Sequence, residues 1–164
     1  MMRHAAAICL TLGCLLTAAP ASAQQAIFVV RHAEKVDDST DAALSPAGEA
    51  RAAALARTLR TAGITAVYAT EFQRTVRTAA PLADMLKLPV TTVPAKDQAG
   101  LIAHVRAAGP ADAVLIVGHS NTLPAILKAL GCTTPVAIAD DEYDNLFVVI
   151  PRSQGAPTLL RLRF

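Results

Sequence analysis

Two histidines in this sequence each follow directly on an apolar stretch that is typical of a buried strand. His32 comes after "AIFVVR", with Arg31 beside it, and His119 comes after "AVLIVG". Another arginine, Arg74, follows a third apolar run, "AVYA", which ends just before Thr70. Guanidinium groups bind phosphate oxygens in pairs, and a neutral imidazole can attack phosphorus. These residue types therefore indicate chemistry on a phosphoryl group.

Strand-like and helix-like segments alternate along the chain and must position these residues. Strands are predicted at the apolar runs 26–30, 66–69, 89–93 and 113–119. Helices are predicted at 45–62, 70–86, 99–108 and 121–130. The last two runs, "NLFVVIP" and "TLLRLRF", predict a hairpin. The pattern predicts an α/β fold: a three-layer sandwich with a mostly parallel sheet, helices on both faces and an antiparallel edge.

Such a sheet is expected to bring the candidate residues together. The carboxyl ends of parallel strands meet at one edge, and ligands bind there near a change in strand order. Arg31, His32, Arg74 and His119 all lie at or just beyond such ends. By contrast, His104 lies within a predicted helix, and we expect it to be an ordinary polar residue.

The segment "GHSNT" also offers a serine that could act as a nucleophile. It resembles the G-x-S-x-G turn of α/β-hydrolases, with Ser120 as the attacking residue. In those enzymes the catalytic histidine follows the serine in the chain, but no histidine follows His119 here. The second glycine is also replaced, by Thr122. We therefore reject a serine hydrolase.

Four motifs, found in order along the chain, resemble those of the histidine phosphatase superfamily, the phosphoglycerate mutase-like enzymes. "FVVRHAEK" resembles the family's strand that ends in R-H-G/A-E, and "LSPAGEARAAALARTL" resembles its first helix. "VYATEFQRTVRTAAPLA" resembles the segment with the second arginine, and "VLIVGHSNTLPAIL" resembles the strand with the second histidine. The resemblance spans nearly all of residues 24–164, which we expect to form a single domain.

The resemblance implies a role for each matched residue. His32 would be the nucleophile that forms a phosphohistidine, and Arg31, Arg74 and His119 would bind the phosphate. The implied activity is that of a phosphatase that needs neither metal nor cofactor and hydrolyses phosphate esters. Thr78 is expected to be structural. The alternative is a non-catalytic module that binds phosphate in the same pocket.

At the proton donor the sequence departs from better-known members of the family. Ser120 follows His119 where the acid phosphatase branch has an aspartate. Asp97 is the only acidic residue between positions 88 and 109, so we predict it as the donor. Competing candidates are Glu34 and the acidic cluster at 140–142.

The first 23 residues have the layout of a secretory signal peptide. A short basic start at Arg3 precedes an apolar segment, then Pro20 and the triplet "ASA". The apolar segment is shorter than the roughly 20 residues of a spanning helix. Cleavage before Gln24 would leave no stable membrane span and predicts a periplasmic or secreted protein. Lipidation at Cys14, which follows Gly13, is the alternative.

The charge balance limits the partners. The chain has 15 basic and 13 acidic residues, and Arg3 would be lost with the signal peptide. Because this balance creates no broad positive field, we expect no nucleic-acid partner. The expected partner is a phosphorylated small molecule or a phosphoprotein.

Overall fold

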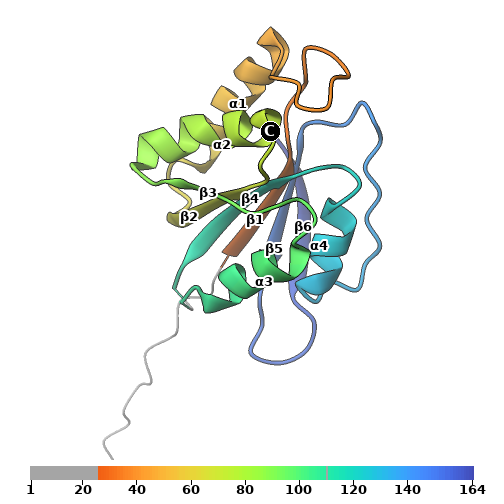
Figure 1. The fold of residues 1–164 in the computed structure, drawn as a ribbon. Coiled ribbons are helices and arrows are strands. Elements are labelled where there is room, and N and C mark those ends of the chain that lie inside the picture. Colours follow the sequence, from red (N-terminus) through yellow and green to blue (C-terminus); the bar gives the residue numbers. More distant parts are fainter. Residues whose placement is uncertain (1–25, 110) are drawn as a thin grey trace, which may run out of the picture.

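A six-stranded sheet covered by helices on both faces organises the described part of the chain, residues 26–109 and 111–164, in a computed structural model (Figure 1). The strands are β1 Ala26–Arg31, β2 Ile64–Ala69, β3 Val90–Thr92, β4 Ala113–Gly118, β5 Asn145–Ile150 and β6 Thr158–Arg163. The helices are α1 Pro46–Leu59, α2 Gln73–Leu86, α3 Gln98–Ala107 and α4 Leu123–Ala129.

The strand order is β3-β2-β4-β1-β5-β6. Strands β3, β2, β4 and β1 are parallel to one another, whereas β5 is antiparallel to β1 and β6 is antiparallel to β5. The predicted fold class, including the antiparallel edge, is confirmed. Every residue of β4 is buried, as a continuous apolar run in the middle of a doubly covered sheet requires.

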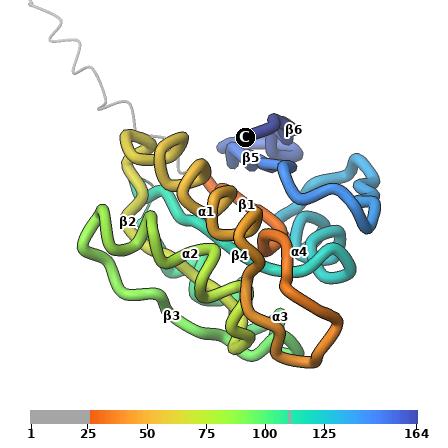
Figure 2. Tube along the Cα trace, turned by 90° about the horizontal axis from the view of Figure 1, so that it is seen from above, coloured from red at the N-terminus to blue at the C-terminus, as the bar shows by residue number. Residues whose placement is uncertain are grey.

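Two separate cores hold the helices against the sheet. On one face α1 and α2 pack through Leu55, Leu59 and Leu82. On the other face α3 and α4 pack through Val105 and Leu127. Figure 2 shows the two helix layers from above, with β5 and β6 extending to one side. Both faces of the central strands β1 and β4 are thus largely covered, which fixes the strand ends that carry Arg31, His32 and His119.

The carboxyl ends of β1 and β4 form a switch point of the sheet. The chain leaves β1 towards α1 on one face and leaves the neighbouring β4 towards α4 on the other. Proteins of the α/β class bind ligands at such a switch point.

The predicted helices are longer than the observed ones at several ends. Helix α2 begins at Gln73, not at Thr70, because Asp41 accepts a hydrogen bond from the Gln73 backbone N–H (2.7 Å) and fixes the start there. Pro81 lies inside α2 without ending it. Helix α1 ends at Leu59, three residues before the predicted end at Ala62.

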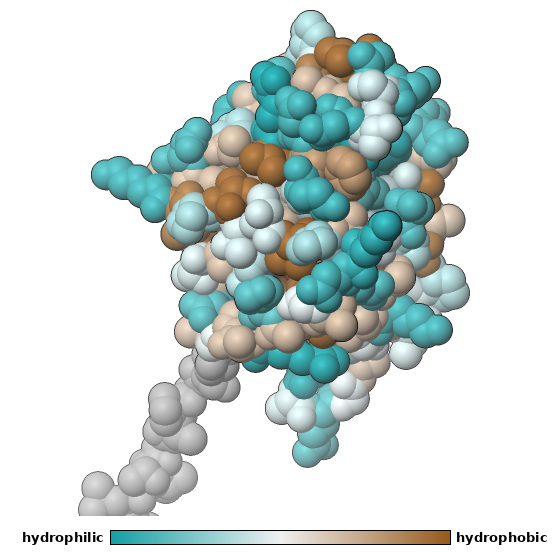
Figure 3. Space-filling model, in the orientation of Figure 1, coloured by the Kyte–Doolittle hydropathy of each residue, from teal (hydrophilic) through white to brown (hydrophobic). Residues whose placement is uncertain are grey.

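The remaining expectations concern the surface and the N-terminus. The face in Figure 3 is mostly hydrophilic, with hydrophobic residues scattered over it. No helix in the described residues is long and apolar enough to cross a membrane. The segment predicted to be a signal peptide, including Cys14, lies outside the described residues. Cys132 is a buried free thiol.

Candidate active site

The ends of β1 and β4 bring the two histidines together. Arg31 pairs with Gly118 in register, and the His32 backbone N–H donates to the Gly118 carbonyl (2.9 Å). One residue further on, the rings of His32 and His119 lie 5.3 Å apart between centroids. Both side chains are buried. One phosphoryl group placed here would contact both rings.

The His32 ring is held in an orientation that suits a nucleophile. Its Nδ1 lies 2.8 Å from the Ala33 carbonyl oxygen, which can only accept, so Nδ1 carries the proton. The lone pair of the neutral ring is then on Nε2. Burial lowers the pKa of His32 from 6.5 to about 4, and the positive charges of Arg74 and Arg31 act in the same direction. The imidazole is therefore neutral and able to attack near neutral pH.

His119 is positioned from the end of β2. Its Nε2 lies 3.0 Å from the Thr70 hydroxyl oxygen, which also contacts the Thr75 hydroxyl (2.8 Å). Burial and, to a lesser extent, the charge of Arg74 lower the pKa of His119 to about 4, while Glu71 partly opposes this change. Thr70 thus supports the second histidine.

Arg31 joins the site to the loop before β5. Its Nη1 donates to the carbonyls of Ala139, Asp140 and Glu142 at 2.9–3.1 Å, and its guanidinium lies 4.0 Å from the ring centroid of Tyr143. Its Nε is buried and has no hydrogen-bond partner among the described residues. A buried unpaired donor is costly, and a phosphate oxygen would satisfy it.

Arg74 extends into the site from the first turn of α2. Its Nη1 donates to the Thr40 carbonyl (2.9 Å), and its guanidinium lies 4.4 Å from the Phe72 ring centroid. The same Phe72 ring meets His119 edge-on at 5.4 Å. Both arginines are therefore held by loop carbonyls and by an aromatic face.

These four residues make a compact, positively charged site. The described residues contain no cluster of three or more His, Cys, Asp or Glu side chains that could hold a metal ion. What the site offers is two fixed guanidiniums and two imidazoles. Such a set can bind a phosphoryl group, neutralise its charge and supply a nucleophile.

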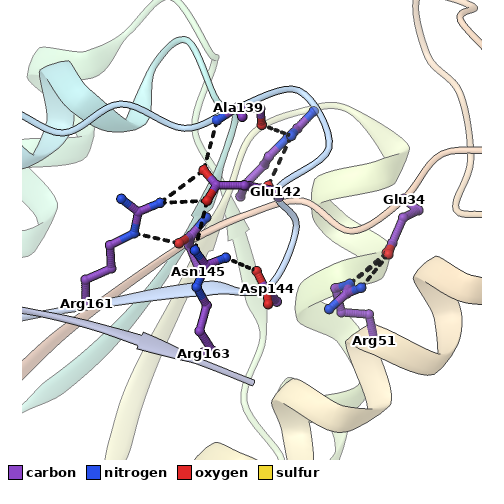
Figure 4. A network of polar contacts seen from close by, with 9 residues as sticks. Glu34, Arg51, Ala139, Glu142, Asp144, Asn145, Arg161 and Arg163 are labelled. Carbon is purple, nitrogen blue, oxygen red and sulfur yellow. Dashed lines mark hydrogen bonds and ion pairs between the residues drawn. The ribbon is translucent and has the colours of Figure 1, made fainter.

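Two of the competing acids are occupied elsewhere (Figure 4). Glu34 accepts hydrogen bonds from Arg51 at 2.6–2.9 Å; burial opposes ionisation, but these bonds hold its pKa below the usual value. Glu142 accepts from the Ala139 backbone N–H and pairs with Arg161 and Arg163. These contacts lower the pKa of Glu142 to about 2. Neither residue holds a proton to donate near neutral pH.

Asp97 lies near the site but is not joined to it. Its carboxylate caps α3 by accepting the Gly100 backbone N–H (2.8 Å). It lines a cavity of about 30 Å³ whose wall also includes Thr70 and Gly118. No hydrogen bond links Asp97 to either histidine within the described residues. The structure therefore brings four of the five predicted residues together and leaves Asp97 across a small cavity.

Three neighbours of the histidines had no sequence signal of their own. Phe72 and Tyr143 support the arginines, with the Tyr143 ring 6.2 Å from that of His32. Glu71 acts electrostatically on His119. Only the position of Glu71 beside Thr70, in the motif already singled out, could have drawn attention to it. Thr78 accepts the Ala33 N–H and donates to the Arg74 carbonyl, a structural role.

Comparison with known families supports the resemblance drawn from the motifs. Residues 27–96 match the model of the histidine phosphatase superfamily (branch 1). This segment carries Arg31, His32 and Arg74, and it ends before Asp97 and His119. The superfamily expected from the sequence is thus supported by an independent match over the part that contains the first histidine.

Solved structures of several phosphatases share the fold. The protein histidine phosphatase SixA in complex with tungstate is 20% identical, with a TM-score of 0.65, covering 84% of this chain and 96% of SixA. Mycobacterial glucosyl-3-phosphoglycerate phosphatase is 15% identical, with a TM-score of 0.67 and coverages of 85% and 97%. A phosphoserine phosphatase mutant from Entamoeba histolytica is 15% identical, with a TM-score of 0.63 and coverages of 82% and 94%. Curated protein sequences gave no match.

Proposed function

We propose that this protein is a metal-independent phosphatase of the histidine phosphatase type, which hydrolyses phosphate esters through a phosphohistidine on His32. The observation that carries this proposal is the pair of neutral imidazoles 5.3 Å apart between two arginines. The similar structures described above are phosphatases for different compounds, so the phosphatase class is supported and the substrate is left open. A phosphorylated small molecule or a phosphoprotein fits equally.

In the proposed reaction, Nε2 of His32 attacks phosphorus while the bond to the leaving oxygen breaks. Arg31, Arg74 and His119 hold the three non-bridging oxygens, which carry the charge of the transition state. Water then attacks the phosphorus of phospho-His32, the P–N bond breaks, and inorganic phosphate leaves. The guanidiniums of Arg31 and Arg74 supply the neutralisation that a metal gives in other phosphatases, so activity is expected to survive EDTA.

The test is covalent labelling. The parent protein, incubated with a ³²P-labelled phosphate ester and quenched in alkali, is expected to carry a phosphate that acid removes. His32→Ala is expected to lose this label and at least about 10³-fold of the activity, because the nucleophile is gone. Label that persists in His32→Ala would contradict the mechanism. Saturable binding of phosphate or vanadate by the parent without label or turnover would support the non-catalytic module instead.

Export is a separate proposal, motivated by the signal-like sequence of residues 1–23. We propose that the protein is cleaved before Gln24 and acts in the periplasm or outside the cell. N-terminal sequencing of the protein recovered from those fractions is expected to begin at Gln24. A mature form that begins at Cys14 would indicate lipidation.

A further inference from the structure

We propose that Glu71 is the residue that protonates the leaving oxygen, a role for which the sequence had suggested Asp97. This inference rests on the proposed phosphatase function and assigns the group that completes it. It concerns substrates whose leaving group is a poor one, such as an alkyl alcohol, because these need a proton as the P–O bond breaks.

The neighbours of Glu71 place it beside the second histidine. Thr70, directly before it, contacts Nε2 of His119 at 3.0 Å. Phe72, directly after it, meets the His119 ring at 5.4 Å. Glu71 is also the carboxylate whose charge acts on His119. Because both flanking residues touch His119, the backbone of Glu71 is fixed at the edge of the phosphate pocket.

Only one oxygen of the Glu71 carboxylate is hydrogen-bonded within the described residues. Its Oε2 accepts the Ala95 backbone N–H at 2.7 Å, which ties it to the loop between β3 and α3. Its Oε1 makes no hydrogen bond within the described residues, and Glu71 is exposed to solvent. One oxygen therefore anchors the group, while the other is available to a substrate that enters from solvent.

Three other carboxylates considered above already have hydrogen-bond partners. Glu34 is bound by Arg51, and Glu142 by Arg161 and Arg163. Asp97 uses Oδ1 to cap α3. None of these is shown to act on His119. Glu71 thus combines closeness to the second histidine, exposure to solvent and an oxygen that has no hydrogen bond within the described residues.

The proposed reaction includes two proton transfers, one in each step. Glu71, protonated at Oε1, gives its proton to the leaving oxygen as the bond from phosphorus to that oxygen breaks and the bond to Nε2 of His32 forms. The alcohol leaves and Glu71 remains as a carboxylate. In the second step this carboxylate takes a proton from the attacking water as the P–N bond breaks, which restores both groups.

Glu71→Gln is the suitable variant, because the glutamine Oε1 can still accept the Ala95 N–H while the proton donor is lost. The quantity to measure is the rate of phosphohistidine formation by rapid quench, which isolates the step in which the leaving group departs. An alkyl phosphate, phosphoserine, is compared with 2,4-dinitrophenyl phosphate, whose leaving group needs no proton. Asp97→Asn serves as the matched control.

We expect Glu71→Gln to slow labelling by phosphoserine about 100-fold or more and labelling by the dinitrophenyl ester less than about threefold. Asp97→Asn should change neither by more than about threefold. An equal effect of Glu71→Gln on both esters, no effect on either, or a leaving-group dependence in Asp97→Asn would overturn the assignment. If the parent protein forms no phosphohistidine at all, the proposed function itself fails.

Discussion

At the scale of single residues, the site depends on keeping two histidines neutral in a positively charged pocket. Burial is the main cause of the low pKa of both rings, and the arginines add to it. Burial thus keeps the imidazole of His32 neutral, which the reaction requires because a protonated imidazole could not attack phosphorus. The bond from Nδ1 of His32 to the Ala33 carbonyl settles which nitrogen attacks.

Arg31 shows how one side chain serves both the loop and the ligand, and Arg31→Lys tests this. A lysine ammonium cannot donate to the three carbonyls that Nη1 contacts and also replace Nε as a donor to phosphate. We expect the inhibition constant for inorganic phosphate to rise at least about tenfold. Hydrogen exchange of residues 139–143 should also become faster. Arg77→Lys, on a half-exposed pair with Glu49, should change neither quantity.

Sequence reasoning identified the site residues that lie at strand ends and missed those that lie in loops. Arg31, His32 and His119 lie at strand ends, so the alternation of apolar runs was enough to bring them together. Tyr143 and Glu71 lie in loops whose paths depend on contacts between distant segments, such as that of Arg31 with residues 139–142. No local pattern encodes such a path.

At the scale of elements, the fit of α1 against the end of β1 explains the glycine in "LSPAG". A Cβ on Gly48 would lie 2.2 Å from the Glu34 carbonyl oxygen, which also accepts the Ser45 N–H at 2.9 Å. Ser45 caps the helix through the Gly48 N–H. The first turn of α1 therefore rests directly on the segment that follows His32.

Gly48→Ala should consequently destabilise the protein although alanine favours helices. The atoms that this Cβ would meet are all backbone atoms of Glu34, so relief of the clash requires α1 to move away from Glu34. We expect a loss of about 2 kcal/mol or more in urea unfolding, together with weaker phosphate binding. Arg57→Ala, exposed on the same helix, should stay within about 0.5 kcal/mol of the parent protein. Equal stability of the two variants would show that α1 is free to shift.

Element type was easier to predict than element ends. The apolar runs gave every strand of the sheet in the described residues, and serine-proline correctly marked the start of α1. Helix α2 started later than predicted, because its start is fixed by Asp41, which is remote in sequence. Pro81 did not break α2, since the packing of Leu82 and Ala83 against the sheet holds the helix.

At the scale of the whole molecule, the two neutral histidines link the site to the stability of the fold. Both have a pKa of about 4 in the folded protein, below the ordinary value of 6.5. As the pH falls below 6.5, the unfolded chain binds protons that the folded protein does not. Stability is therefore fully present above pH 6.5 and is lost as the pH falls towards 4.

Urea unfolding between pH 6.5 and about pH 5 measures this loss before most carboxylates titrate. We expect up to about 2 kcal/mol per histidine over this range, as an upper limit because the two rings interact. The double variant His32→Asn, His119→Asn should have a much flatter profile, whereas His104→Gln, at an exposed position, should match the parent. Inorganic phosphate should reduce the loss, because an anion between the rings favours their protonated forms. A parent profile that stays flat, or an equal slope in the double variant, would show that the buried histidines do not couple the site to folding.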